Sequence, residues 1–554
     1  MPRRDATVLL GVIGIGVFLA GLELMITAVA LPSILRDLSD ITQLRHAAWI
    51  INGYLLAYIV TMPLAGRLAD VWGARRMLYA GLLFFTVGSA LAGAAPSLDA
   101  LIGARVVQAI GGGILVPVGT AAASHLFEGH ARARALGVVG ALTFLGMAAG
   151  PFVGAAILSS IHPESPLAAL GIVGGPLLHA LDPAWRWVFY INVPLGIIGL
   201  VLAWAAAGDW DTPRRGGAVD IGGAILFSAT LVGALGAISL VGAPSATGGG
   251  IDPARAIGGL VLIAAVAGVV FVVRSLRRPD PFLDPRLFLD RVFASAAIVS
   301  LLTGYAFATA IVGGALFVDR VLYGGPDEQQ VALGALAGAT ALGALVSGLL
   351  IRGISLRLIS LGGLVAAVVA LVLMSRWDPT VTLAALSATL ALFGLGFGLT
   401  VTPRSTAAVL AAGRSAYGAA SSTVTVARMI GMAIGLAILA AFGSTVIDHL
   451  YDQVYGTPDG YKAFIPEDLR DRPLKDGLVV DALETWAAGE AASVMVGLFL
   501  VAAGVTVAAI PAALALEART RILSGEPAPS GSPDGPARRE GVDGIDEEPS
   551  AIAL

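Results

Sequence analysis

Long apolar runs separated by short polar loops constrain this chain more than any other feature. We count fourteen such runs, most of them about 20 residues or longer, which is the length a helix needs to cross ~30 Å of hydrocarbon. Only a helix can pair its own backbone groups there without water. Charged residues make up 13% of the chain, whereas soluble proteins carry roughly 25%. The sequence therefore predicts an all-α polytopic membrane protein and not a soluble enzyme.

The runs divide into six, two and six. We expect spans near residues 6–30, 47–65, 77–95, 99–121, 135–158, 187–207, 219–242, 256–273, 292–318, 330–351, 356–375, 381–402, 416–443 and 487–516. The division predicts four parts: an N-terminal six-helix bundle (1–210), two extra helices with a cytoplasmic linker (211–290), a C-terminal six-helix bundle (291–520) with an outer loop at about 444–486, and a disordered cytoplasmic tail (521–554). The short apolar segment 167–181 is interpreted as interfacial or re-entrant.

Arginine placement predicts the orientation of these spans. With the N-terminus in the cytoplasm, the cytoplasmic segments hold the arginine clusters and the opposite loops hold few, as the positive-inside rule requires. An even number of spans returns the C-terminus to the cytoplasm. We therefore expect a multi-pass protein of the bacterial inner membrane with both termini cytoplasmic.

The sequence lacks the residues or motifs that several kinds of catalysis and binding require. The chain has no cysteine, which excludes disulfides and thiol catalysis. Its histidines show no metal-ligand spacing, and the sequence contains no phosphate-binding loop for ATP and no basic block for nucleic acid. We therefore expect no metal, no cofactor and no nucleic-acid partner.

Several motifs in the N-terminal half resemble those of one family. The segment Gly66-Arg-Leu-Ala-Asp-Val-Trp-Gly-Ala-Arg-Arg76 resembles the signature loop of the major facilitator superfamily and stands in the same place, between the second and third spans. The fourth run begins with a similar Arg105-Val-Val-Gln motif, and the glycines of the fifth run, with Gly150-Pro151, resemble the antiporter motif of drug:proton antiporters. Trp185-Arg-Trp and Asn192-Val-Pro resemble the fourteen-span branch of that group.

A narrower resemblance concerns two stretches. Residues 49–70 and 426–432 are similar to mycobacterial envelope exporters that move triacylglycerides outward with a periplasmic lipoprotein. The family resemblance implies a major facilitator fold of two six-helix bundles plus two central helices. It also implies a monomer that works by alternating access and draws energy from the proton gradient. The implied partners are a hydrophobic small molecule or lipid, membrane lipids and an outer-face lipoprotein.

Charged residues inside spans are costly and therefore mark candidate functional sites. Three lie well inside the runs: Glu23, Arg105 and Arg428. At 1.5 Å per residue, Glu23 and Arg105 lie at similar depths, about 10 Å and 9 Å below the outer surface, so they can pair. Such a pair either couples a proton to transport or locks the first span to the fourth. Arg428 is either a switchable counter-ion, for substrate, for Glu23 or for a cluster of backbone carbonyls, or a static contact to helix ends in the N-terminal half.

The signature loop is interpreted as a gate. Asp70 would cap or pair with neighbouring helix ends, and Gly66 and Gly73 would permit a tight turn. Arg75 and Arg76 either join the gate or anchor the loop to anionic lipid. Gly150-Pro151 would bend the fifth span, because proline removes a helical hydrogen bond.

The expected central cavity is mostly apolar. Besides Glu23 and Arg428, its polar residues are Thr27, Asn52, Thr143, Thr303, Tyr305 and Thr400. Such a cavity suits a lipophilic drug or a neutral lipid better than a sugar. We therefore expect a proton-coupled exporter of a hydrophobic compound, with two alternatives: a dedicated lipid exporter that hands its cargo to a lipoprotein, and a non-transporting receptor or scaffold.

Overall fold

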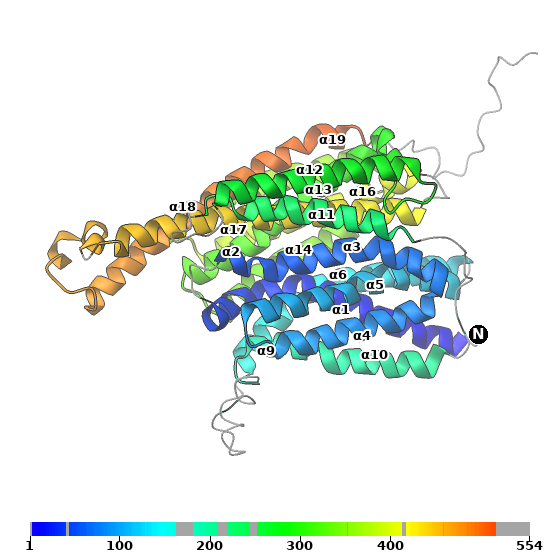
Figure 1. Ribbon diagram of the computed structural model, residues 1–554, viewed down its shortest axis with the longest axis horizontal. Helices are drawn as coiled ribbons and strands as arrows, with labels where there is room; N and C mark the ends of the chain where they lie inside the picture. The colour runs from blue at the N-terminus through cyan, green and yellow to red at the C-terminus, as the bar shows by residue number, and fades with distance from the viewer. Residues whose placement is uncertain are drawn as a thin grey trace, which may run out of the picture. The chain divides into compact units, whose positions relative to one another are not determined.

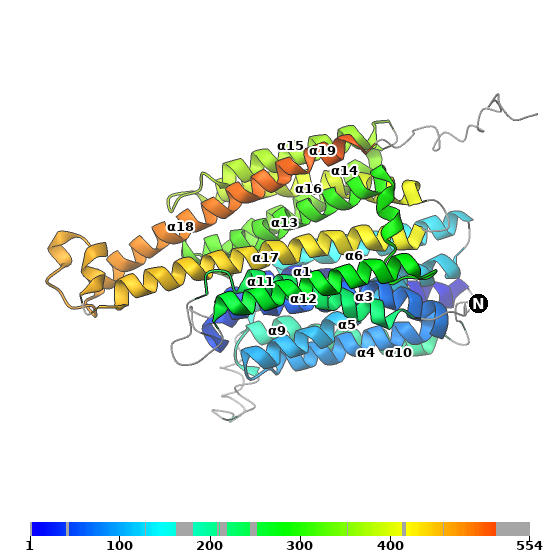
Figure 2. The ribbon, with the colours of Figure 1, turned by 45° about the horizontal axis from the view of Figure 1, so that its top comes forward.

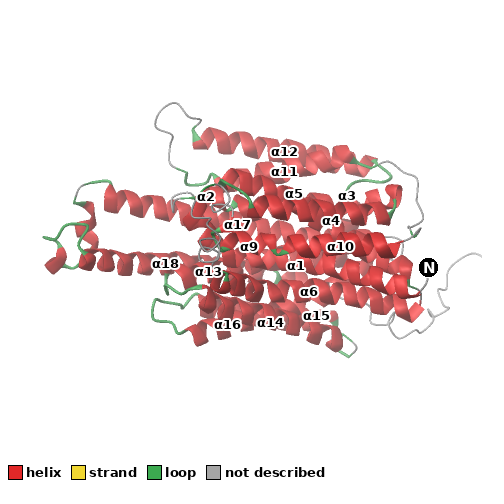
Figure 3. Cartoon of the chain, turned by 90° about the horizontal axis from the view of Figure 1, so that it is seen from below, coloured by secondary structure: helices red, strands yellow, loops and turns green. Residues whose placement is uncertain are grey.

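The structure is a computed structural model that describes residues 3–39, 44–127, 129–161, 175, 181–207, 210, 219–243, 252–351, 353–412, 417–457 and 459–516. Figures 1, 2 and 3 show that this part of the chain consists of helices and connecting loops. Among the described residues, thirteen helices are long and apolar enough to span a membrane, and a bent pair within α6 counts as a fourteenth if its two parts form one span. The prediction of an all-α protein with fourteen spans is therefore confirmed. The segment 167–181 and the tail lie largely or wholly outside the described residues.

We describe the helices as an N-terminal half, a central pair and a C-terminal half. The N-terminal half contains α1 (Arg3–Leu38), α3 (Trp49–Trp72), α4 (Ala74–Gly93), α5 (Leu98–Leu126), α6 (Gly129–Ser160), and the span made by α9 (Trp185–Tyr190) with α10 (Asn192–Ala207). The central pair is α11 (Ile221–Ser239) and α12 (Pro253–Arg277). The C-terminal half contains α13 (Arg291–Arg320), α14 (Pro326–Leu350), α15 (Leu356–Met374), α16 (Leu383–Ala412), α17 (Tyr417–Tyr455) and α18 (Gly477–Ala508). Short elements are α2 (Leu44–Ala47), α19 (Ile510–Leu514) and the 3-10 helices η2 (Pro285–Leu289), η4 (Gly460–Phe464) and η5 (Glu467–Leu469).

The two halves repeat the same helix pairings. In the N-terminal half, the most extensive contacts join α1 with α6, α4 with α5, and α3 with α5. In the C-terminal half they join α13 with α17, α15 with α16, and α14 with α16, which are the helices at equivalent places in the order. The halves meet mainly where α6 packs on α14 and α3 packs on α17. Packing thus reveals an internal repeat that the sequence does not show.

Glycines bring the paired helices into close contact, as small residues do in membrane proteins. A Cβ on Gly146 of α6 would lie 2.1 Å from the carbonyl oxygen of Phe18 in α1. At the equivalent pairing, a Cβ on Gly431 of α17 would lie 1.8 Å from the carbonyl oxygen of Leu301 in α13. Neither position has room for a side chain, so these glycines are needed for packing.

The central pair lies at the edge of the bundle. Helix α11 contacts α12, α3 and α17. In α12, by contrast, only 11% of the most apolar 18-residue stretch is buried by the rest of the described chain. Asp220 caps α11 and accepts hydrogen bonds from Arg274 of α12 and from the amide of Phe282. These contacts fix the two helices to each other at one end, and the exposed apolar face of α12 is suited to lipid.

Helices α17 and α18 form a hairpin that extends beyond the ends of the other spans, at the face opposite the N-terminus of α1 (Figures 1 and 2). We call the two faces the hairpin face and the N-face. The sequence placed a loop at about 444–486, but α17 continues to Tyr455 and α18 begins at Gly477. A small apolar cluster explains this continuation, because Val454, Tyr461 and Val479 are buried together beyond the main bundle.

Candidate functional site

A buried ion pair lies in the middle of the N-terminal half. Glu23 of α1 is fully buried, Arg105 of α5 is 1% exposed, and an Nη1 hydrogen of Arg105 is donated to Oε1 of Glu23. The sequence predicted this contact, because Glu23 and Arg105 were placed at similar depths below the outer surface. Thr27, one turn further along α1, donates to the same carboxylate oxygen at 3.1 Å.

The ion pair belongs to a larger hydrogen-bond network. The Nδ2 amide of Asn192, the first residue of α10, donates to Oε2 of Glu23 at 2.8 Å. Arg105 also donates to the side-chain oxygen of Gln108, which in turn donates to the Ser89 hydroxyl on α4 at 2.8 Å. All of these side chains are buried. The network therefore joins α1, α4, α5 and α10 through a chain of buried hydrogen bonds.

Asn192 and Gln108 are members of this network that sequence reasoning did not assign. Both stand in the motifs that carried the family resemblance, but we interpreted those motifs as family markers and not as ligands of Glu23. The signal was available, because Asn192 is a polar residue at the start of an apolar span.

Two tyrosines connect this network to the C-terminal half. The guanidinium of Arg105 lies 4.1 Å from the ring centre of Tyr54 on α3, a cation–π distance. Tyr54 stacks on Tyr58 with ring centres 5.9 Å apart, and Tyr58 lies within electrostatic range of Arg428 on α17. Tyr54 and Tyr58 thus lead from the network around Glu23 towards Arg428.

Asn52 and Tyr305 were predicted to line the cavity. Asn52 of α3 is fully buried, and neither atom of its amide has a hydrogen-bond partner among the described residues. A buried unpaired amide is unusual and is a candidate contact for a bound molecule. Tyr305 is 5% exposed and lies in the core of α13. The structure does not bring either residue into the network around Glu23.

A further buried charge deep inside a span, Arg404, escaped the sequence reasoning. Arg404 of α16 is 1% exposed and donates a hydrogen bond to Thr303 of α13. The twelfth span was expected to end near residue 402, before Pro403, but the helix continues through this proline to Ala412. The expectation that only Glu23, Arg105 and Arg428 lie well inside the spans is therefore wrong, because Arg404 does so too.

The signature motif is mostly helical. Helix α3 continues to Trp72 and α4 begins at Ala74, so Gly66 lies inside a helix and not at a turn. The expected turn role of Gly66 is therefore wrong. Gly73 makes the turn alone, with a φ of 93° that favours glycine. The side chain of Asp70 lies outside the described part of the structure.

Basic residues of the motif lie at the N-face. Arg76 is exposed, and Arg75 lies 6.0 Å from the ring centre of Tyr79. An ion pair that the sequence did not predict joins Arg67 of α3 to Asp280, beyond α12, at 2.8 Å. It ties the N-terminal half to the linker before α13.

The fifth span is bent as predicted. The parts Val138–Met147 and Phe152–Ser160 of α6 differ in direction by 44°, and the break between them contains Gly150 and Pro151. A proline that removes a helical hydrogen bond accounts for a bend of this size. Helix α6 contacts both α1 and α14, so the bend lies where the two halves meet.

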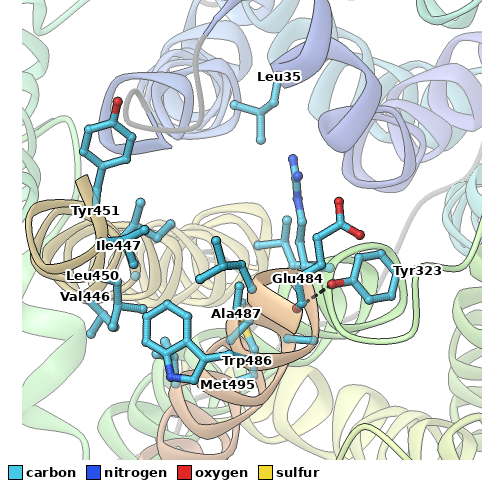
Figure 4. A pocket seen from close by; sticks show the side chains of 18 of the residues that line it. Leu35, Tyr323, Val446, Ile447, Leu450, Tyr451, Glu484, Trp486, Ala487 and Met495 are labelled. Atoms are coloured by element: carbon cyan, nitrogen blue, oxygen red, sulfur yellow. Dashed lines mark hydrogen bonds between the residues drawn. The ribbon is translucent and has the colours of Figure 1, made fainter. Parts of the chain in front are cut away.

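An apolar pocket of about 470 Å³ opens at the hairpin face (Figure 4). Its walls come from the ends of α1 and α13 and from the extended parts of α17 and α18, with Leu35, Ile447 and Trp486 among the lining residues. Tyr323 has a φ of 51° and donates its hydroxyl hydrogen to the carbonyl oxygen of Glu484, which holds α18 against the end of α13. A pocket of this size and character suits a hydrophobic molecule.

The arrangement of two repeated helical halves around buried charges is that of a polytopic membrane transporter. The family model of the Major Facilitator Superfamily matches residues 13–436. The chain belongs to this superfamily. The predicted major facilitator fold is confirmed, and so is the prediction of a membrane transporter and not an enzyme.

Named relatives fall into two groups. A triacylglyceride transporter of Mycolicibacterium hassiacum is 32% identical to this chain over 80% of either chain. Multidrug resistance protein 3 of Bacillus subtilis is 27% identical over 82% of either chain. A crystal structure of a bacterial homologue of the human lysosomal transporter Spinster, inward-facing and unoccupied, has a TM-score of 0.62 over 93% of this chain and 98% of that one. At 19% identity, this likeness concerns the fold alone.

Proposed function

We propose that the chain is a proton-coupled antiporter that exports a hydrophobic compound by alternating access. The observation that carries the proposal is Glu23, a fully buried carboxylate in the first span that contacts Arg105, Thr27 and Asn192. A charge at such a depth is costly, and in membrane proteins it commonly marks a proton or ion pathway.

The geometry around Glu23 supports coupling between a proton and helix movement. Its two oxygens accept hydrogen bonds from α1, α5 and α10. A proton on one oxygen would remove an acceptor and the negative charge, and so weaken the contact with Arg105. Proton loading would thereby loosen α1 from α5, whereas proton release would restore the pair. The alternative role is a permanent ion pair that only joins the two helices.

The proposed orientation places the N-face in the cytoplasm of a bacterial cell. Arg67, Arg75, Arg274 and Arg278 lie at or near the ends of helices on that face, in agreement with the positive-inside rule. The hairpin face and its pocket then lie outside the inner membrane, where an exported molecule would leave.

The apolar pocket supports a hydrophobic cargo. Relatives named as triacylglyceride transporters and as a multidrug resistance protein share this chain's fold family, so both a neutral lipid and a lipophilic drug are candidates. The α17–α18 hairpin favours the lipid as a second candidate function. It extends an apolar wall beyond the bundle, where an outer lipoprotein could receive a cargo insoluble in water.

Transport in reconstituted vesicles tests the proposal. We expect Glu23→Gln to lose at least about tenfold of the pH-gradient-driven transport of a labelled triacylglyceride or a fluorescent lipophilic cation, because glutamine cannot carry the proton. The matched control is Glu467→Gln, since Glu467 lies in the hairpin with 89% of its side chain exposed. Transport by Glu23→Gln with an unchanged pH dependence would contradict the coupling role.

A further inference from the structure

Two arginines in the C-terminal half lie near each other inside the spans, and we call them the arginine pair. Arg404 of α16 is 1% exposed, donates to the Thr303 hydroxyl and lies 5.1 Å from the ring centre of Phe397. Arg428 of α17 lies within electrostatic range of Arg404. The backbone of Arg428 packs directly against Gly304, the residue after Thr303. Adjacent residues of α13, Thr303 and Gly304, thus contact Arg404 and the backbone of Arg428, respectively.

Arg428 is not satisfied by the protein. Its Nε atom is buried and has no hydrogen-bond partner among the described residues. A guanidinium has five N–H donors and no acceptor, so these groups need oxygen atoms. Burial of a donor without an acceptor is costly, and a charged donor costs more than a neutral one.

The arginine pair also lacks a counter-ion. Arg105 is paired with Glu23, and buried Arg186 has Asp37 at 3.8 Å. No ion pair in the described part of the chain includes Arg404 or Arg428. Two positive charges close together inside the spans repel each other, and the repulsion is strong where water is scarce. An anion placed between them would offset both charges.

We infer that the arginine pair binds an anionic head group, a carboxylate or a phosphate, on the exported compound. Arginine is suited to this role because its planar fork of donors matches the oxygens of either group. Phe397 stacks on Phe307 with ring centres 4.1 Å apart, which places an apolar surface beside the charges. The site therefore suits an amphiphile with an acidic head and an apolar tail.

The position of the site fits a molecule that passes between the halves. Arg428 lies within range of Tyr58, which belongs to α3 of the N-terminal half. A head group on the arginine pair would thus lie beside the two tyrosines that lead towards Arg105 and Glu23. The inference rests on the proposed export function for its cargo, but it makes a separate statement about head-group charge.

Binding measurements on the full-length protein in a non-ionic detergent test the inference. The probes are oleoyl-lysophosphatidate, oleate, mono-olein as a neutral molecule with the same tail, and inorganic phosphate. We expect both anionic amphiphiles to bind more tightly than mono-olein. Arg404→Gln and Arg428→Gln should each weaken anionic binding by about 10- to 100-fold, the loss of one buried charged hydrogen-bond donor, and leave mono-olein unaffected. Arg376→Gln, at an exposed residue beyond α15, is the control and should bind as the parent does.

Several outcomes distinguish the possibilities. Arg404→Lys and Arg428→Lys keep the charge and should keep part of the preference for anions, which preserves the test if a glutamine variant fails to fold. Binding of inorganic phosphate as tight as that of lysophosphatidate would support the anion site and assign it to a free anion. Equal binding of mono-olein and the anionic amphiphiles by the parent, with no change in the variants, would overturn the inference. Glu23→Gln should still bind the anionic amphiphiles more tightly than mono-olein. A transport experiment that disproves proton coupling through Glu23 would therefore not disprove anion binding by the arginine pair.

Discussion

Removal of Arg105 alone should destabilise the protein more than removal of the whole Glu23–Arg105 pair. Arg105→Gln leaves Glu23 buried without its charged partner, and breaking a buried pair in this way typically costs about 3–5 kcal/mol. Thr27 and Asn192 still donate to the carboxylate, so we expect a value near the lower end, about 3 kcal/mol. The double variant Glu23→Gln/Arg105→Gln leaves no unpaired charge at this site and should recover about half of that loss.

The assay is the free energy of unfolding, measured by titration with sodium dodecyl sulfate in mixed micelles at pH 7.5. The control cycle uses Glu467 and Arg470, whose side chains are 89% and 45% exposed and lie 3.5 Å apart. An exposed pair is worth about 0–1 kcal/mol, so neither of its single variants should differ much from the parent. A double variant as unstable as Arg105→Gln, or a loss below about 1 kcal/mol for Arg105→Gln, would refute an ionised Glu23 paired with Arg105 in the resting protein.

Three further predictions follow from the packing and the ion pairs. Gly431→Ala should cost at least about 1–3 kcal/mol of stability, because its Cβ would lie 1.8 Å from a carbonyl oxygen, whereas Gly497→Ala, with no atom within 4 Å, should be tolerated in the same unfolding titration. Burial raises the pKa of Asp220, but hydrogen bonds from two amides and Arg274 outweigh it and hold that pKa below its usual value. The stabilisation from this carboxylate is therefore present above its unfolded pKa of about 3.9 and lost as pH falls through the lower folded value. The melting-temperature difference between parent and Asp220→Asn should accordingly stay constant from about pH 7 to 5 and shrink below about pH 4; a difference that changes near neutral pH would contradict this. Asp319→Asn removes the ion pair with Arg36 that joins α13 to α1 at the hairpin face, and it should increase cysteine-labelling rates at engineered sites in the pocket; unchanged rates would show that the ion pair does not hold that face closed.

The sequence predicted the fold because fourteen apolar runs report directly on membrane thickness. It also predicted the contact between Glu23 and Arg105, since a helix advances by a fixed rise per residue and two antiparallel helices can be compared in depth. Both inferences need only local information.

What the sequence did not predict depends on contacts between distant segments. Arg404 was missed because the twelfth span was predicted to end near residue 402, whereas the helix continues through Pro403, as neighbouring helices allow inside a span. Gly66 was assigned to a turn by position in a motif, yet α3 continues past it. The repeat between the halves is visible in helix pairing and not in residue identity, because packing conserves small residues at contacts and leaves other positions free.

Helix α17 is an unbroken element of 39 residues, and this length has a mechanical consequence. Arg428 lies among the buried charges, whereas Tyr455 lies at the far end of the hairpin, about 40 Å away at the rise of an α-helix. A rigid rod of that length acts as a lever: a tilt of about 5° at Arg428 would move its tip by roughly 3–4 Å. Binding of a charged group near Arg428 would therefore move the end of α17 at the hairpin face. The position of that end would then depend on whether the site in the middle of the helix is occupied.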